Sequence, residues 1–382
     1  MVTLGFCLAG CALVRTPTPT TVAGPSLAAS GSVGYAVCPN AVTPVELATR
    51  TAEPDIELPI TGTPAPGDFA IATSPDGKWA YVVTTDGVAP APTTGSGAPV
   101  TTGGATSTTV AGPTAQNVVI PINLVTQSAG APIDIPGSGP THGIVVLPNG
   151  TTVLAASGQT VVPVNVVTRR VQAPINLGVG HTVYGMALNP LGTVLYVLVA
   201  GGVIPVNAVN LTAGGPVPTG LAVSSVYSPH GIGVSPNGGT VYVIGQGGSD
   251  YGGRVLPINA GTGVLGPPAS FDKFGIAAPA AMAVTPDGSA LEIVDSANNW
   301  VNPLPVNSFT SPPGPVRLPE GVSGGTEHPS DIVLGPGGST AYIVEGFDSV
   351  IPYTLSTQAF AAPIEVCDGA TSMTVAPSPA GS

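Results

Sequence analysis

Charged side chains are scarce in this chain and make up 7% of its 382 residues. An average soluble domain has roughly a quarter. A composition so poor in charge cannot supply the polar face of a long amphipathic helix or the flanking charges of a coiled coil. Lys and Arg number only eight, against 20 Asp and Glu, and the formal net charge is -12. Because no basic stripe is available to neutralise phosphates, we expect no nucleic-acid partner.

Long apolar runs are also missing, although the mean hydropathy is positive at +0.42. The chain contains 53 Gly and 44 Pro, which together with polar residues interrupt every apolar stretch. None approaches the ~20 residues that a membrane-spanning helix needs, so we expect no transmembrane span. A chain so rich in Gly and Pro should consist mainly of strands and turns.

One short phrase, apolar-Pro-apolar-Asn or a close variant, recurs about every forty to fifty residues, a period that indicates a repeat architecture. Ile204-Pro205-Val206-Asn207 is an example. The seven copies lie at 43–46, 120–123, 162–165, 204–207, 256–259, 304–307 and 351–354. Since Pro is normally confined to edge strands, a bulge or a strand start is expected at each copy.

A second repeated signal, Pro-x-Gly between two alternating apolar strands, predicts hairpin turns. These turns lie at 75–77, 148–150, 190–192, 236–238, 286–288 and 336–338, with a degenerate copy at Pro377. Each unit then has four short strands: an inner one such as 231–235, a second such as 240–244, a third with the Pro phrase and a fourth such as 173–177. Four strands repeated seven times predict an all-β, seven-bladed β-propeller of antiparallel blades.

The two ends of the chain predict how the ring closes. Residues 371–376 supply only an inner strand, whereas 33–38, 42–48 and 56–60 supply the three strands that this blade lacks. We therefore expect one propeller over 32–382, and a monomer. Residues 86–116 are a low-complexity insertion with one charge, Asp86, which predicts a mobile loop; it is either a tolerated insertion or a site of glycosylation or partner contact.

The segment 1–31 has a different character. Leu8-Ala9-Gly10-Cys11 matches the lipobox of bacterial lipoproteins, and a tract rich in Thr, Pro, Ala and Ser follows it as a tether. Against this, the stretch before Cys11 is short for a signal peptide and has no basic residue, which a start site further upstream would explain. Cys11 is thus a candidate for lipidation; otherwise the segment carries two free thiols. The expected location is extracellular or at the cell surface.

Cys38 and Cys367 are expected on one face of the closing blade. Cys38 ends a second strand, Cys367 precedes the inner strand of the same blade, and in an up-and-down blade these two places meet. They predict either a disulfide that clasps the two ends, which suits an oxidising compartment, or two small buried apolar side chains.

Signals for chemistry are sparse, because the chain lacks a nucleotide-phosphate loop, a Cys-x-x-Cys pair, a metalloprotease helix and a nucleophile elbow. All four histidines precede or start inner strands, which places them on one face, near the mouth of the central channel. Ligand or metal candidates there are His142, His230, His181, His328, Asp68, Asp331 and Tyr184. His with carboxylates suits a metal or an acid/base site, whereas the plainer interpretation is that polar residues gather in wet loops. His142 and His230, each followed by Gly, are expected to approach a common point.

Residues 42–49 and 69–83 resemble the YVTN-type β-propeller repeat of bacterial exported and surface proteins, and the resemblance extends over about 33–377. Asn mostly stands here where the family has Asp in the third strand. The resemblance implies a non-catalytic cell-envelope or secreted scaffold with a protein or envelope partner. The alternative is an enzyme acting at the channel mouth, because similar propellers include lactonases and the virginiamycin B lyase type. Their motifs are not matched here, so neither a catalytic residue nor a cofactor is assigned.

Overall fold

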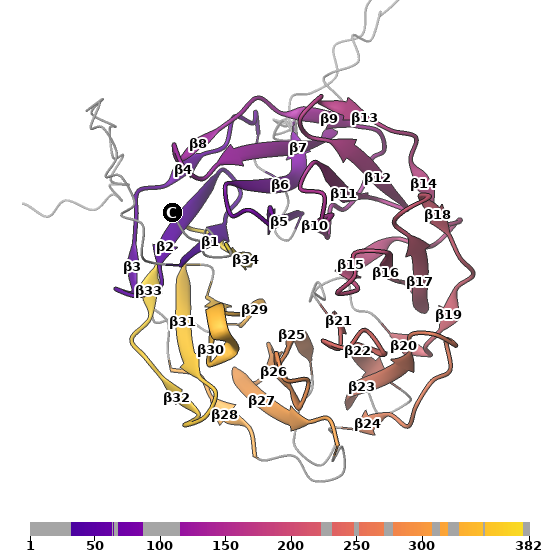
Figure 1. The fold of residues 1–382 in the computed structure, drawn as a ribbon. Helices are drawn as coiled ribbons and strands as arrows, with labels where there is room; N and C mark the ends of the chain where they lie inside the picture. Colours follow the sequence, from indigo (N-terminus) through magenta and orange to yellow (C-terminus); the bar gives the residue numbers. More distant parts are fainter. Residues whose placement is uncertain are drawn as a thin grey trace, which may run out of the picture.

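The computed structural model describes residues 32–62, 64, 68–86, 115–222, 231–247, 252–270, 278–307, 314–319, 328–346 and 348–376. Seven small antiparallel sheets stand around a central axis, each with one inner strand next to the axis (Figure 1). The predicted all-β, seven-bladed propeller is therefore confirmed. Within the described ranges the single helical element is the short turn η1 (Pro336–Gly338). Of the predicted loop 86–116, Asp86 ends one described strand and Gln116 begins the next, while 87–114 and the segment 1–31 lie outside the described residues.

The first three blades follow one another along the chain (Figure 1). Blade 1 consists of β5 (Phe69–Thr73), β6 (Trp79–Asp86), β7 (Gln116–Asn123), β8 (Ser128–Ala129) and β9 (Ile133–Ile135). Blade 2 consists of β10 (Ile144–Val146), β11 (Thr152–Ser157), β12 (Thr160–Asn165), β13 (Arg170–Val171) and β14 (Ile175–Asn176). Blade 3 consists of β15 (Val183–Leu188), β16 (Val194–Val199), β17 (Gly202–Asn207), β18 (Thr212–Ala213) and β19 (Val217–Pro218).

Blades 4 to 6 repeat the arrangement with small variations. Blade 4 consists of β20 (Leu221–Ala222), β21 (Ile232–Val234), β22 (Thr240–Gly247), β23 (Gly252–Asn259) and β24 (Ala269–Ser270). Its two short strands β20 and β21 both pair with the inner side of β22. Blade 5 consists of β25 (Pro279–Val284), β26 (Ala290–Asp295), β27 (Trp300–Pro305) and β28 (Val316–Arg317). Blade 6 consists of β29 (Asp331–Leu334), β30 (Thr340–Glu345), β31 (Ser349–Thr354), β32 (Ala359–Phe360) and β33 (Ile364–Glu365).

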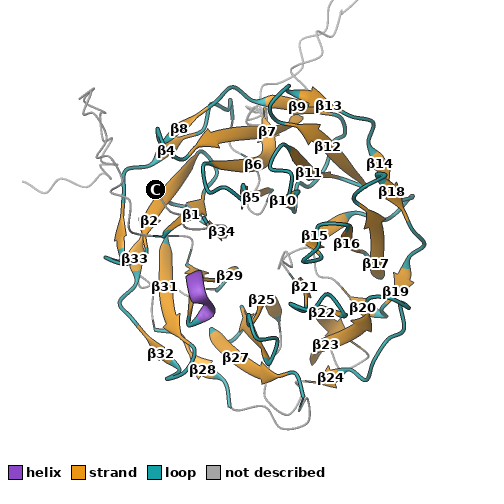
Figure 2. Cartoon of the chain, in the orientation of Figure 1, coloured by secondary structure: helices purple, strands orange, loops and turns teal. Residues whose placement is uncertain are grey.

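Blade 7 joins the two ends of the chain, as the divided repeat predicts. Its inner strand is β34 (Ser372–Val375), which pairs with β1 (Val33–Val37). The sheet continues outward through β2 (Ala41–Glu46) to β3 (Thr51–Ala52) and β4 (Ile56–Glu57). In Figure 2 all seven blades, including this one, radiate from the axis with their inner strands surrounding it. The pairing of β34 with β1 satisfies two strand edges that would otherwise stay open at the two ends of the chain.

The repeated Pro of the third strand faces one fixed position of the second strand. The pairs are Tyr35–Pro44, Tyr81–Pro121, Leu154–Pro163, Tyr196–Pro205, Tyr242–Pro257, Glu292–Pro303 and Tyr342–Pro352. In blade 5 the Pro in this register is Pro303, so the copy assigned to 304–307 was displaced by two residues. Because side chains alternate with a period of two, the displaced copy keeps the same face and the same apolar pattern.

The Pro residues do not interrupt their own strands, and the expected bulge or strand start there was wrong. β12 continues through Pro163, whereas the fourth strand is divided into β13 and β14 opposite it. The missing N–H of Pro163 falls at this gap, and its carbonyl accepts a hydrogen bond from the N–H of Gln172 at 2.9 Å. The fourth strand was predicted as one piece. In most blades it is divided in two, because the Pro of the neighbouring third strand has no N–H to offer at that point.

In blades 1 to 4 an Asn two residues after the Pro closes the next turn. The side-chain oxygen of Asn207 accepts hydrogen bonds from the backbone N–H of Val209 at 2.9 Å and of Asn210 at 3.0 Å. Asn123 and Asn259 make the equivalent two bonds, and Asn165 accepts from the N–H of Thr168. The repeated phrase is therefore explained by backbone needs of the blade, a Pro that fits a divided neighbour and an Asn that caps a turn.

The hydrophobic core lies between blades. Seven clusters of buried side chains are each drawn from two adjacent blades, so that every blade packs on both of its faces. Leu198 of β16 and Val243 of β22, for example, belong to the cluster between blades 3 and 4. This arrangement leaves the ends of the inner strands to polar residues, and these define the candidate site.

Candidate functional site

The three described histidines lie at the entrances to inner strands. His142 is two residues before β10, His181 is two residues before β15, and His328 is three residues before β29. Asp68 directly precedes β5, the inner strand of blade 1. Since inner strands run parallel to one another around the axis, these residues share one face of the propeller, which we call the channel mouth. His230 lies outside the described residues, so the expected approach of His142 and His230 stays a prediction.

His142 bridges two neighbouring blades. Its Nε2 lies 3.2 Å from Oδ1 of Asp68 in blade 1, and its ring centroid lies 6.3 Å from that of Tyr184 in blade 3. The hydroxyl of Thr141 donates to the backbone carbonyl of Asp68 at 2.6 Å. The side chain of His142 is 9% exposed, and its Nδ1 is buried without a hydrogen-bond partner among the described residues. The sequence patterns placed Asp68, His142 and Tyr184 on one face, and the structure brings these three together.

His181 and His328 are held by backbone carbonyls. Nδ1 of His181 lies 2.6 Å from the carbonyl oxygen of Leu177, at the end of blade 2. Nδ1 of His328 lies 2.5 Å from the carbonyl oxygen of Ser296, which belongs to blade 5. In both cases Nδ1 carries the hydrogen, because a carbonyl can only accept. Each histidine therefore ties the entrance of its own blade to the preceding blade.

Asp331 is buried at the start of β29 and has three hydrogen-bond donors. Its Oδ2 accepts from the Ser372 hydroxyl at 3.0 Å and from the Met373 N–H at 2.9 Å, both on β34. Its Oδ1 accepts from the N–H of Ile332 at 2.9 Å. The carboxylate thus links blade 6 to blade 7 and leaves little capacity for a ligand.

A metal ion finds no ready set of ligands in the described part of the chain. There, no three His, Cys, Asp or Glu side chains are grouped in a way that could hold an ion. The candidates instead fall into separate pairs, each of which is distributed over two blades. Sequence position correctly indicates a shared face but does not show the backbone carbonyls that occupy the rings of His181 and His328.

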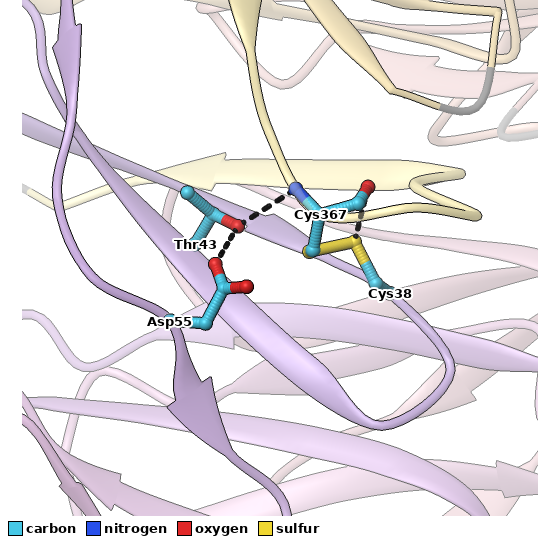
Figure 3. Close-up of a disulfide and its surroundings, with 4 residues drawn as sticks. All are labelled: Cys38, Thr43, Asp55 and Cys367. Atoms are coloured by element: carbon cyan, nitrogen blue, oxygen red, sulfur yellow. Dashed lines mark hydrogen bonds between the residues drawn. A yellow bond between two sulfur atoms is a disulfide. The ribbon is translucent and has the colours of Figure 1, made fainter. Parts of the chain in front are cut away.

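The predicted disulfide between Cys38 and Cys367 is present and stands beside the closing blade (Figure 3). The two Cα atoms are 6.1 Å apart and the residues are separated by 329 positions in the sequence. The N–H of Cys367 donates to the hydroxyl of Thr43 at 3.0 Å, and that hydroxyl donates in turn to Asp55. The bridge joins the end of β1 to the loop that enters β34, so it reinforces the ring closure.

One buried pair, Glu292 and Tyr353, was not identified from the sequence. Glu292 on β26 is 4% exposed, and burial raises the pKa of its carboxyl to about 7. It occupies the position that holds Tyr in five other blades. Tyr353 of blade 6 packs in the cluster between blades 5 and 6, and burial first and Glu292 second raise the pKa of its hydroxyl. Neither Oε2 of Glu292 nor that hydroxyl has a hydrogen-bond partner among the described residues. An alignment of the seven second strands by their register would have shown that Glu292 stands where most blades have Tyr.

Comparisons with known proteins define the class by fold alone. No family model and no curated protein matches this chain. A chain of Kuenenia stuttgartiensis hydrazine synthase is similar in structure, with a TM-score of 0.61 at 16% identity over 82% of this chain and 90% of that chain. A functionally unknown protein from Desulfotomaculum acetoxidans has a TM-score of 0.61 at 12% identity over 90% and 98%. At such low identity these similarities support the propeller fold and carry no activity.

No helix within the described ranges has the length and apolar character to cross a membrane.

Proposed function

We propose that this protein is a non-catalytic binding scaffold of the cell envelope or the secreted space. The observation that carries the proposal is that the described polar side chains of the channel mouth connect neighbouring blades. His142 with Asp68, His328 with Ser296 and Asp331 with Ser372 each cross from one blade to the next, and His181 with Leu177 closes the connection between blades 2 and 3. Side chains whose polar atoms are engaged in contacts within the ring are poor candidates for a general base or a metal ligand. A rigid ring is also a suitable support for loops that bind a partner.

A partner in the cell envelope is the expected ligand of the scaffold. Cross-linking of intact cells, followed by purification of a tagged full-length chain, should capture the same envelope partner with the wild type and with His142→Ala. Capture lost on His142→Ala, while the variant keeps its far-ultraviolet circular dichroism, would contradict a purely structural role of the mouth. Absence of any reproducible envelope partner would contradict the scaffold itself.

Export and lipid anchoring are finer parts of the proposal. The disulfide between Cys38 and Cys367 supports an oxidising compartment, since such bonds are rare in the cytosol. Acylation of Cys11, which lies outside the described residues, would add a membrane anchor, and the resemblance to the YVTN-type repeat supports a surface location. In cells fractionated at high salt, Cys11→Ser should move the protein from the membrane to the soluble fraction; an unchanged distribution would remove the anchor from the proposal.

The second candidate function is a lactonase- or lyase-like enzyme, and the contact of His142 with Asp68 is what favours it. A carboxylate that accepts from one ring nitrogen leaves the other nitrogen as a base, and Tyr184 lies beside the ring. Against this, Nδ1 of His142 is buried and needs a rearrangement to reach a substrate. Turnover of a lactone panel by the wild type, lost in His142→Ala, would establish the enzyme; no turnover by either protein is the outcome the scaffold predicts.

A further inference from the structure

The face opposite the channel mouth is built from turns. Strands alternate in direction within each blade, so the Pro-x-Gly turn after the inner strand and the Asn turn after the third strand lie at the same end. We call this end the turn face. In blades 1 to 4 it comprises 74–79, 123–129, 147–152, 165–171, 189–194, 207–213, 235–240 and 259–265.

Exposed apolar side chains gather on the turn face of blades 1 to 4. Eight large hydrophobic residues are exposed in the described part of the chain, and seven of them belong to these turns. They are Trp79, Val125, Val167, Leu191, Val209, Val264 and Leu265, whereas Val179 lies at the channel mouth. The described turns of blades 5 to 7 contribute none. The apolar residues therefore occupy one side of one face.

Three of these residues hold equivalent positions in three consecutive blades. Val125, Val167 and Val209 each follow the turn-closing Asn by two residues and are 74%, 72% and 75% exposed. Asn123 accepts from the backbone N–H of Val125 and Asn207 from that of Val209, whereas Asn165 accepts from Thr168, so the turn does not require a Val side chain. Blades 4, 6 and 7 form the same turn with Gly261, Ser356 and Ala48 in that place. A repeated exposed Val that the fold does not need points to a contact outside the chain.

The charge of the same turns is opposite to that of the whole chain. They hold three cations, Lys78, Arg169 and Arg170, and one carboxylate, Asp76, in a chain with eight basic and 20 acidic residues. Asp76 is engaged by the Ser74 hydroxyl and by the N–H of Lys78. None of the three cations forms an ion pair with another described residue, but the guanidinium of Arg169 donates to the backbone carbonyls of Ala131 and Pro132. Arg170 also lines an open hollow of about 630 Å³, which leaves room for a phosphate group.

The described chain begins at the same face. The carbonyl of Ser32 accepts from the N–H of Leu47 at 3.1 Å, and Leu47 lies in the Asn-type turn of blade 7, next to blade 1. Residues 1–31 therefore join the propeller on the turn face, with the lipidation candidate Cys11 among them. An anchor at Cys11 would therefore be attached to the propeller on this face and not at the channel mouth.

We propose that the turn face of blades 1 to 4 docks on a bilayer that contains anionic phospholipids. The valines, Leu191 and Trp79 would enter the boundary between headgroups and acyl chains, while Lys78 and Arg170 lie near the phosphates. The inference rests on the proposed function only in placing the protein at the envelope. A bilayer fits better than a protein partner because the apolar side chains stand on separate turn tips, and a fluid surface accepts them without matched shape. The net charge of -12 opposes docking, but only one of the 20 acidic residues, Asp76, lies in the turns of blades 1 to 4, and salt screens charges beyond about 10 Å.

Vesicle co-sedimentation tests the proposal. The protein is the full-length chain with Cys11→Ser, which removes the candidate acyl site, and the vesicles are phosphatidylcholine with or without phosphatidylglycerol. We expect binding to the phosphatidylglycerol vesicles that weakens with salt. The triple variant Val125→Ser, Val167→Ser, Val209→Ser should bind at least about tenfold more weakly, because three apolar side chains lose their burial. Each cation removed, as in Arg170→Gln, should cost about fivefold.

Val179→Ser is the matched control, since it makes the same change at an exposed position on the other face. Serine occurs naturally at the equivalent turn position, Ser356, so the triple variant should fold. No binding of phosphatidylglycerol vesicles, equal binding by the triple variant, or an equal loss in Val179→Ser each overturns the proposal. If vesicles fail to bind while cross-linking captures an envelope protein, the docking inference falls and the scaffold stands; if both fail, the scaffold falls too.

Discussion

Glu292→Gln should stabilise the protein at neutral to alkaline pH and change little in acid. The carboxyl is buried between blades 5 and 6, and its pKa is raised from the ordinary 4.5 to about 7. Because the folded pKa is the higher one, the stability that the protonated carboxyl contributes is complete below about pH 4.5 and is lost as the pH rises toward 7. Gln keeps the shape and stays neutral throughout.

The expected size follows from the same values. The difference between 4.5 and about 7 corresponds to about 3 kcal/mol of unfolding free energy. With an unfolding entropy of about 2.1 cal/mol/K per residue over 382 residues, the thermal midpoint should rise by about 4 °C near pH 8. Near pH 4 wild type and variant should melt within about 1 °C of each other.

Scanning calorimetry of both proteins at several pH values is the assay, and the informative quantity is the difference between their midpoints. The control is Glu57→Gln, the same substitution on an exposed position of β4, where the change should stay within about 0.5 kcal/mol at every pH. A difference for Glu292→Gln that does not vary with pH would refute the reasoning, because it would show that the wild-type carboxyl does not titrate between folded and unfolded states.

Three further outcomes are expected. Peptide mapping without reductant should recover Cys38 linked to Cys367, and free thiols in exported protein would contradict the bond. Replacing both cysteines by Ala should lower the free energy of unfolding by about 2 to 4 kcal/mol. Asp331→Ala should cost about 3 kcal/mol in urea denaturation, because two donors of β34 lose their acceptor; a loss below about 0.5 kcal/mol would show that the carboxylate does not join the blades. Glu292→Tyr and Tyr353→Val should each destabilise alone but compensate each other in the double variant; strictly additive effects would show that the two sites do not share space.

Much of the fold can be predicted from the sequence because its signals are local. A Pro phrase, a Pro-x-Gly hairpin and an Asn that caps a turn each have a backbone cause; the first two recur in nearly every blade and the Asn cap in blades 1 to 4. Their number and the divided final repeat predict seven blades and the clasp of Cys38 with Cys367. The register of blade 5 was missed, since Pro303 and Pro305 lie two residues apart and two residues preserve the face of a strand.

The candidate site is less accessible to sequence reasoning. Strand order places His142, Asp68 and Tyr184 on one face, but the acceptors for His181 and His328 are backbone carbonyls, which any residue could provide. The presence of Glu292 in place of Tyr, with Tyr353 of the next blade beside it, depends on packing between two blades. No pattern within a single repeat predicts it. Exposure also decides the role of the turn valines, because in the sequence they resemble buried strand residues.

The metal content of the purified protein tests the central claim most directly, that the polar residues of the channel mouth join blades and do not hold a catalytic ion. The full-length wild type and the double variant His142→Ala, His230→Ala are prepared without chelators and examined by elemental mass spectrometry. The scaffold predicts far less than one equivalent of any divalent transition metal in both proteins, at equal levels. Close to one equivalent of a single metal in the wild type, lost from the double variant, would contradict the scaffold and favour the enzyme.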